Sequence, residues 1–216
     1  MDNFFDLCQF RAEKLKSDPS ILYEKLPDGV KEMFIEYNKL GFLTFTSQPG
    51  GECKNLIFKS AMHRFNCNKS RKSPEPDDIL GEGIRRQRAF VRGFMDQKMA
   101  DFVFNKLKDD SYIFIRTEKN NLPFPHEVKF GSVKFFNDQP LVTEDIGDYD
   151  PNGPDGDWTF NLGLSLRKPF SLLLGKEYPN IDSTNIIEVE VLDTRWNENS
   201  YLWIKLLETI REYQNI

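Results

Sequence analysis

Two polar segments of the chain carry side chains that are suited to ligand binding. In the first, Gly41 to Gly50, apolar and hydroxyl residues alternate up to a Pro-Gly turn, which predicts a strand over Phe42 to Thr46. Its polar side chains belong to Thr44, Thr46, Ser47 and Gln48. Hydroxyl and amide groups at a strand end have no packing role there, so they indicate hydrogen bonding to a ligand or to a neighbouring loop.

The second segment places a carboxylate beside several arginines. It contains Glu82, Arg85, Arg86, Gln87, Arg88 and Arg92, and it follows a shorter basic run at Lys69, Arg71 and Lys72. The sequence predicts a helix over residues 86 to 107, whose first N–H groups would add to the positive charge and suit a phosphate or carboxylate. A solvated helix face and a nucleic-acid site are the alternatives. Nucleic acid would need stacking aromatic residues, whereas Phe90 and Phe94 are expected in the core.

Both segments resemble motifs of the C-terminal regulatory domain of eukaryotic methylenetetrahydrofolate reductase. Gly41 to Pro49 is similar to the strand GxLTxxSQP of that family, Asp77 to Gly83 to its segment DPIVGWG, and Arg86 to Phe94 to its segment QxAYxxFF. Further on, Val189 to Asp193 is similar to VNLVD, and Asn199 to Trp203 is similar to DNCLW. The motifs keep the family's order.

The likeness extends from residue 33 to residue 214 and has two departures. Residues 51 to 76 differ from the family's loop, and Glu82 replaces the aromatic residue of GWG. Nothing in the chain is similar to the family's catalytic barrel domain. The resemblance therefore implies a regulatory module without a reaction of its own, and we expect no catalytic residue and no cofactor.

The resemblance also implies a ligand, because that domain binds S-adenosylmethionine or S-adenosylhomocysteine. The ligand-binding residues would then be Thr44, Thr46, Ser47 and Gln48 on one segment and Glu82, Arg86, Gln87 and Arg88 on the facing one. The carboxylate of Glu82 would take the ammonium group or the ribose hydroxyls of the ligand. The alternative is a protein–protein interaction protein that kept the fold and lost the ligand site.

The remaining pattern is that of a mixed chain of helices and strands. Helices are predicted over residues 2–17, from a cap at Asp28 to Leu40, and over 86–107, 169–176 and 199–214. Strands are predicted over residues 42–46, 112–116, 128–136, 162–166 and 186–192. Because no βα period repeats, we expect one α+β domain over residues 31–216, with central β-sheet structure flanked by helices, after an N-terminal helical extension over residues 1–30.

The strand from Phe42 to Thr46 is expected to be central and buried, and the helix of Leu202 and Trp203 is expected to close the core. The residues expected to be mostly inaccessible are Leu43, Phe45, Phe90, Phe94, Phe102, Val191, Leu202 and Leu206. The segment from Cys53 to Pro76 is rich in polar residues and is expected to form a loop.

Composition limits the classes of function. The chain has 216 residues, of which 39% are hydrophobic, and a formal net charge of −5, which argues against binding to nucleic acid or to an anionic membrane. It has neither a long apolar run nor a charged-then-apolar leader. Three cysteines that are far apart favour free thiols in a reducing compartment, so we expect a cytoplasmic protein.

Two further segments have residue types that bind metal ions. Asp148 to Trp158 matches the first half of an EF-hand loop, but Thr159 stands where a bidentate glutamate is needed, so an acidic turn is the alternative. Cys53, His63 and Cys67 are three zinc-binding residue types where a structural site needs four. We therefore expect no metal site. No serine triad, phosphate-binding loop or two-histidine protease motif is present, so an enzyme is not expected.

Overall fold

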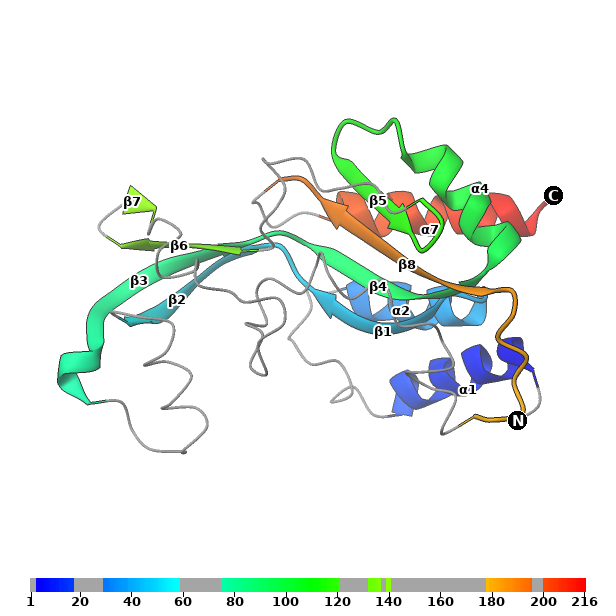
Figure 1. Ribbon diagram of the computed structural model, residues 1–216, viewed down its shortest axis with the longest axis horizontal. Helices are drawn as coiled ribbons and strands as arrows, with labels where there is room; N and C mark the ends of the chain where they lie inside the picture. The colour runs from blue at the N-terminus through cyan, green and yellow to red at the C-terminus, as the bar shows by residue number, and fades with distance from the viewer. Residues whose placement is uncertain are drawn as a thin grey trace.

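Two long strand segments run side by side through the molecule and are shared between two sheets (Figure 1). β1 (Leu43–Gln48) continues after two residues as β2 (Gly51–Phe58), and β3 (Ile79–Gln87) continues after two residues as β4 (Phe90–Asp96). The computed structural model describes residues 3–17, 29–58, 75–120, 132–136, 139–140, 178–195 and 200–216. The other elements are α1 (Phe4–Ser17), α2 (Val30–Lys39), the 3-10 turn η2 (Pro76–Asp78), α4 (Gln97–Leu107), β5 (Ile113–Thr117), β6 (Ser132–Phe136), β7 (Gln139–Pro140), β8 (Ile186–Asp193) and α7 (Tyr201–Gln214).

Both sheets are antiparallel. Sheet A has the strand order β1-β4-β8-β5, and sheet B has the order β2-β3-β6-β7. Because the two long strands pass from one sheet into the other, sheet B extends away from the helices as an arm, on the left of Figure 1. The expected α+β fold, with sheet structure flanked by helices, is confirmed.

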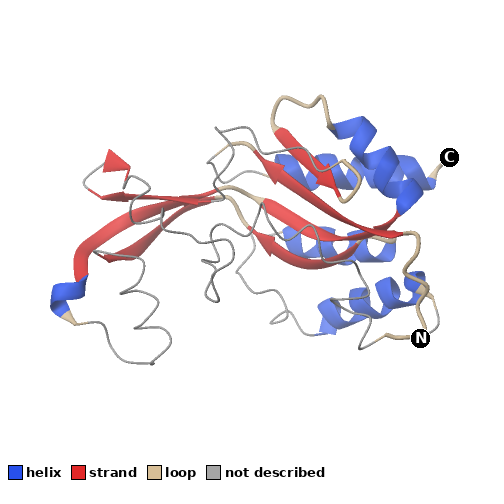
Figure 2. Ribbon diagram, in the orientation of Figure 1, coloured by secondary structure: helices blue, strands red, loops and turns tan. Residues whose placement is uncertain are grey.

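One face of sheet A packs against α2, α4 and α7, and this interface holds the main core (Figure 2). The strands contribute alternate residues, such as Val91 of β4 and Val189 and Val191 of β8, as the two-residue period of a strand requires. Trp203 of α7 is fully buried, and the hydroxyl of Tyr37 donates a 2.6 Å hydrogen bond to its carbonyl oxygen. The expectation that the helix of Trp203 closes the core is confirmed.

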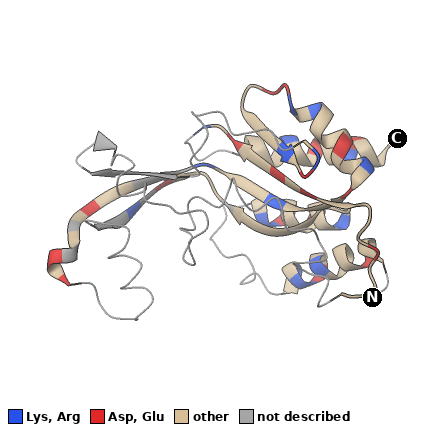
Figure 3. Cartoon of the chain, viewed as in Figure 1, with Lys and Arg blue, Asp and Glu red and all other residues tan. Residues whose placement is uncertain are grey.

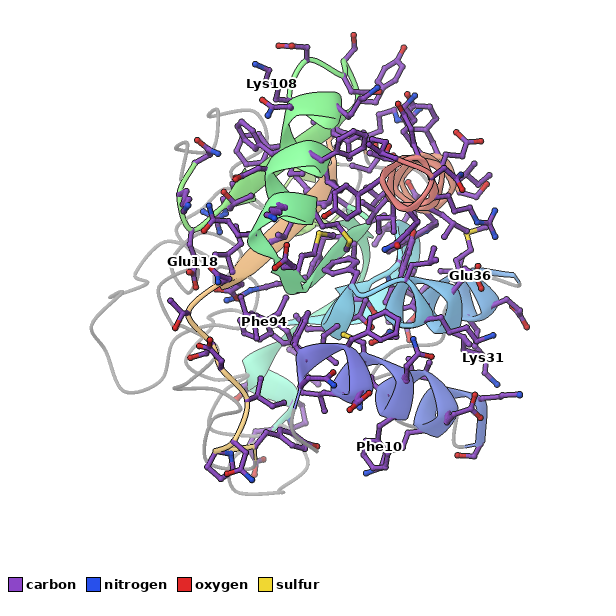
Figure 4. All side chains as sticks on the ribbon, turned by 90° about the vertical axis from the view of Figure 1, so that its right-hand side faces the viewer. Phe10, Lys31, Glu36, Phe94, Lys108 and Glu118 are labelled. Atoms are coloured by element: carbon purple, nitrogen blue, oxygen red, sulfur yellow. The ribbon has the colours of Figure 1, made fainter. Side chains whose placement is uncertain are left out.

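The opposite face of sheet A, here called the outer face, is covered at one end by α1. Leu7 and Cys8 of α1 pack in a second, smaller core with Leu43 and Phe94 of the sheet. Figure 4 shows Phe94 between the sheet and α1. α1 is also tied to α2, because the amide of Gln9 donates a 2.7 Å hydrogen bond to the carbonyl oxygen of Lys39. The N-terminal helix therefore packs directly on the domain that follows it.

The helix predicted over residues 86 to 107 is wrong in its first half. The chain continues as β3 and β4 up to Asp96, and only then does α4 begin, with the Asp96 side chain accepting a 2.9 Å hydrogen bond from the N–H of Lys98. The strand β4 places Gly93 in close contact with the backbone of β1. A Cβ atom there would lie 2.3 Å from the carbonyl oxygen of Leu43, so only glycine lets β1 and β4 approach each other as they do.

Two other expectations about β1 and its continuation are also wrong. β1 lies at the edge of sheet A, and the central strands are β4 and β8. Residues 53–58, the first part of the expected loop, belong to β2, which pairs with β3 from Gly51 opposite Gln87 to Phe58 opposite Ile79. The rest of the expected loop up to residue 74 lies outside the described residues.

Most of the expected core residues are buried, and the exceptions are aromatic. Leu43, Phe94, Val191, Leu202 and Leu206 are buried. Phe45, Phe90 and Phe102 are only partly buried, because they lie at the margins of the clusters against which they pack.

The remaining elements agree with the sequence where the structure describes them. α1, β5, β8 and α7 form at the predicted positions, and β6 forms the last part of the strand predicted over 128–136. α2 is capped by Gly29, at φ 83°, rather than by Asp28, which is outside the described residues. The strand predicted over 162–166 and the helix over 169–176 also lie outside them. Among the described helices, none has the length and apolar character needed to span a bilayer.

Candidate functional site

The outer face of sheet A carries charged side chains in the middle of the fold. Figure 3 shows acidic positions along the central strand β8. Across β4, β8 and β5, the register aligns a row of Phe90, Leu192 and Phe114, a row of Arg92, Glu190 and Arg116, and a row of Phe94, Glu188 and Glu118. Charged groups are thus held side by side by the strand pairing itself.

Two ion pairs link these strands. Nε of Arg116 lies 2.7 Å from Oε2 of Glu190, and its NH2 group lies 2.6 Å from the same oxygen. The Arg92 guanidinium binds Oε1 of Glu188. Arg116, Glu188 and Glu190 are at most 2% exposed, so both carboxylates are held in a medium where unpaired charge is costly.

Part of the hydrogen-bonding capacity of this cluster is unused by the described residues. Oε2 of Glu188, Oε1 of Glu190 and Oε1 of Glu118 are buried, and no described residue donates a hydrogen bond to any of them. The cluster also contains two guanidinium groups and three carboxyl groups among the described residues, so negative charge is in excess when all are ionised. The arrangement therefore favours an added donor that carries positive charge.

Burial shifts the pKa values of these carboxyl groups upward. It raises the pKa of Glu188 to about 7, although Arg92 opposes the shift; the nearby carboxylates of Glu190 and Glu118 reinforce it. Burial also raises the pKa of Glu190, against the attraction of Arg116, and that of Glu118. Proton uptake and a bound cation are therefore alternative ways of neutralising the same oxygens.

A second charged group lies at the other end of sheet A, where β8 ends. The guanidinium of Arg195 binds both oxygens of Asp193, at 2.9 and 2.7 Å, and stacks on the rings of Tyr112 and Tyr201 at 4.3 and 4.8 Å. Burial lowers the pKa of Arg88 to about 10, and the charge of Asp193 opposes that shift. The protein's own arginine fills this aromatic site, which therefore has a structural role.

The polar residues predicted on β1 have different surroundings from one another. Thr44 is buried and bonded to Asn38 of α2, which donates to its hydroxyl at 2.8 Å and accepts from its N–H at 3.1 Å. Thr44 thus joins β1 to α2. Thr46 and Ser47 are half-buried, and Thr46 lies opposite Arg92, beside the charged row of the outer face. Gln48 pairs with Phe90 through the backbone.

The residues predicted on the facing segment are spread along β3. Gln87 and Arg86 pair with Gly51 and Glu52, so this end of β3 lies next to the end of β1 as expected, but as a strand and not as a helix start. Arg88 is buried. Glu82 is exposed in the arm, five residues or about 16 Å along β3 from Gln87.

The outer-face residues were not predicted as a site from the sequence. Arg92 was included only in the basic run, and Glu190 only in a strand motif. The usable signal is the alternation in β8, where Glu188 and Glu190 stand between apolar residues. That pattern predicts a strand with one charged face. When such a face is buried, its carboxylates need side chains of opposite charge or hydrogen-bond donors beside them. The pattern does not show that these partners come from β4 and β5.

The metal sites considered from the sequence gain no support from the described structure. Among the described residues, no group of three or more His, Cys, Asp or Glu side chains is arranged so that it could hold a metal ion. Residues 148–158, His63 and Cys67 lie outside them, and of Cys53 only the backbone is described. A separate shallow hollow of about 340 Å³ lies on α7, between Tyr201 and Glu208, and carries an exposed Ile204. It does not reach the charged cluster of the outer face.

No family model matches the chain, and no curated protein matches it. The geometry of the outer face is therefore the main guide to function.

Proposed function

We propose that the chain is a non-catalytic binding module that holds a small molecule against the outer face of sheet A. The observation that supports the proposal is the pair of glutamates on β8. Glu188 and Glu190 are at most 1% exposed, and each has a carboxylate oxygen that accepts no hydrogen bond from the described residues. Such an oxygen costs roughly 1–3 kcal/mol when it stays unsatisfied, and a bound donor removes that cost.

The mixture of charges suits a ligand that is itself charged at two points. An amino-acid group carries an ammonium, which a glutamate binds, and a carboxylate, which an arginine binds. S-adenosylmethionine and S-adenosylhomocysteine both carry this group, and they are also the ligands that the sequence resemblance implies. Thr46, which borders the charged row, offers a hydroxyl for the polar atoms of such a ligand.

Isothermal titration calorimetry with S-adenosylmethionine and S-adenosylhomocysteine tests the proposal. We expect heat of binding with at least one of them, and we expect Arg92→Met to weaken the binding about tenfold or more. Arg195→Met is the matched control, because Arg195 lies at the other end of the sheet among its own tyrosines. Absence of heat from both compounds at millimolar concentration would refute them as ligands.

A second candidate function is binding to a protein through the arm. The arm extends beyond the helices, and Glu52, Lys54 and Glu82 are exposed on it (Figure 1). If the chain acts through the arm alone, it should bind neither S-adenosylmethionine nor S-adenosylhomocysteine. Its binding to the partner protein should then be changed by charge reversal at Lys54 and not by Arg92→Met. That pattern would favour the second candidate over the first.

A further inference from the structure

We propose that Glu118 and Glu188 together form a site for a primary ammonium group. The inference rests on the proposed function and adds the position and chemistry of one contact. Glu118 follows β5 and Glu188 lies in β8, and the N–H of Glu118 donates a 3.2 Å hydrogen bond to the carbonyl oxygen of Glu188. The two residues are therefore neighbours, with Glu118 directly after the end of β5 and Glu188 in β8. Figure 4 shows Glu118 on the side of β8 away from α7.

Both carboxylates have capacity left for a donor. Oε1 of Glu188 is bound by Arg92, whereas its Oε2 is buried and accepts no hydrogen bond from the described residues. The same is true of Oε1 of Glu118. Two buried carboxylate oxygens of neighbouring residues, each close enough for the charge of Glu118 to act on Glu188, thus have capacity to accept from an added donor group.

The local charges favour a single positive group at this end of the cluster. Arg116 is bound to Glu190, and Arg92 is bound to Glu188, so each of these two guanidinium groups is paired with a carboxylate. Glu118 is the third carboxyl group, and no ion pair to it is present among the described residues. One added positive charge would bring the cluster to neutrality.

A primary ammonium group fits this position better than a metal ion does. It is a compact charge with three N–H donors, which is enough to bond both free oxygens and one more acceptor. Calcium takes six to eight oxygen ligands, whereas no three His, Cys, Asp or Glu side chains among the described residues are arranged so that they could hold a metal ion. A ligand with an amino group therefore matches the two glutamates, and the α-amino group of S-adenosylhomocysteine has this chemistry.

The inference can be tested with S-adenosylhomocysteine, its analogue without the amino group, and n-butylammonium, each followed by calorimetry and by thermal stability of the full chain. We expect S-adenosylhomocysteine to bind at least about tenfold more weakly to Glu118→Gln and to Glu188→Gln than to the unchanged chain. The analogue should bind all three proteins with similar, low affinity. Glu82→Gln is the matched control and should bind like the unchanged chain, because Glu82 lies in the arm.

The possible failures are distinct. If S-adenosylhomocysteine binds and neither Gln variant weakens it, the ammonium site is wrong and the proposed function stands. If neither S-adenosylhomocysteine nor S-adenosylmethionine binds, but n-butylammonium raises the melting temperature and Glu188→Gln removes that rise, the proposed ligand is wrong and the ammonium site stands. If none of the three compounds acts, both ideas fail. Protection by calcium that requires Glu118 and Glu188 would overturn the ammonium site in favour of a metal site.

Discussion

The buried pair of Arg116 and Glu190 allows a quantitative test of the charged outer face. Both side chains are at most 2% exposed, and the guanidinium reaches the carboxylate through two nitrogens, at 2.7 and 2.6 Å. Glu190→Leu leaves the guanidinium of Arg116 buried without this carboxylate. Removal of one partner of a buried ion pair costs about 3–5 kcal/mol, and we expect a loss of free energy of unfolding in that range.

The double change Arg116→Met with Glu190→Leu should recover most of this loss. It replaces the pair with apolar side chains of similar volume, and such replacements are commonly neutral or stabilising because no charge has to be desolvated. Arg116→Met alone should cost less than Glu190→Leu, because Arg92 lies directly opposite Glu190 in the register and can still attract its carboxylate.

Urea denaturation of the ligand-free protein, followed by circular dichroism, gives the four free energies of the cycle. Glu212→Gln is the control, since its ion pair with Lys106 is about half exposed and surface pairs contribute at most about 1 kcal/mol. A loss below about 1 kcal/mol for Glu190→Leu would refute the reasoning. A double variant whose loss equals the sum of the single losses would refute it as well, because the pair would then not interact.

Two further predictions concern Gly93 and Glu188. Gly93→Ala should lower the free energy of unfolding by about 1–3 kcal/mol or more, because its Cβ would meet the backbone of Leu43 at 2.3 Å; chemical denaturation measures this, and an unchanged midpoint would contradict the packing of β1 on β4. The pKa of Glu188 is raised from 4.5 to about 7 on folding, so its contribution to stability is full below pH 4.5 and is lost as the pH rises towards 7. The unchanged chain should therefore lose roughly 1–3 kcal/mol relative to Glu188→Gln between pH 4.5 and pH 8 in the absence of ligand, and a constant difference would refute the shift.

The sequence predicts strands and helices well where only one periodicity fits. β8 alternates from Ile187 to Val191, and α7 has a helical period, so both elements are predicted correctly. Residues 86 to 96 fit both patterns, because Phe90 and Phe94 are four residues apart and lie on one face of either a helix or a strand. The close approach of Leu43 to Gly93 decides in favour of the strand, and this contact joins distant parts of the chain.

The order of strands and the composition of the site depend on such distant contacts as well. The motif of β1 does not show that it pairs on one side only, so its place at the edge of sheet A could not be predicted. In the same way, Arg92, Arg116 and Glu190 come from three strands that are far apart in sequence. Local patterns predict that each strand has a charged face, and only the pairing register brings the charges together.

Two strands pass from sheet A into sheet B, so a rotation at the junction between the sheets would displace the far end of the arm. β3 has nine residues, so the arm reaches about 30 Å from the junction between the sheets. A rotation of only about 5° at that junction displaces the tip by roughly 2.5 Å at this length. Arg92 stands on β4, three residues beyond Ala89, the second of the two residues between β3 and β4. A small adjustment of twist beside the charged row is therefore magnified into a displacement of atomic size at the far end of the arm.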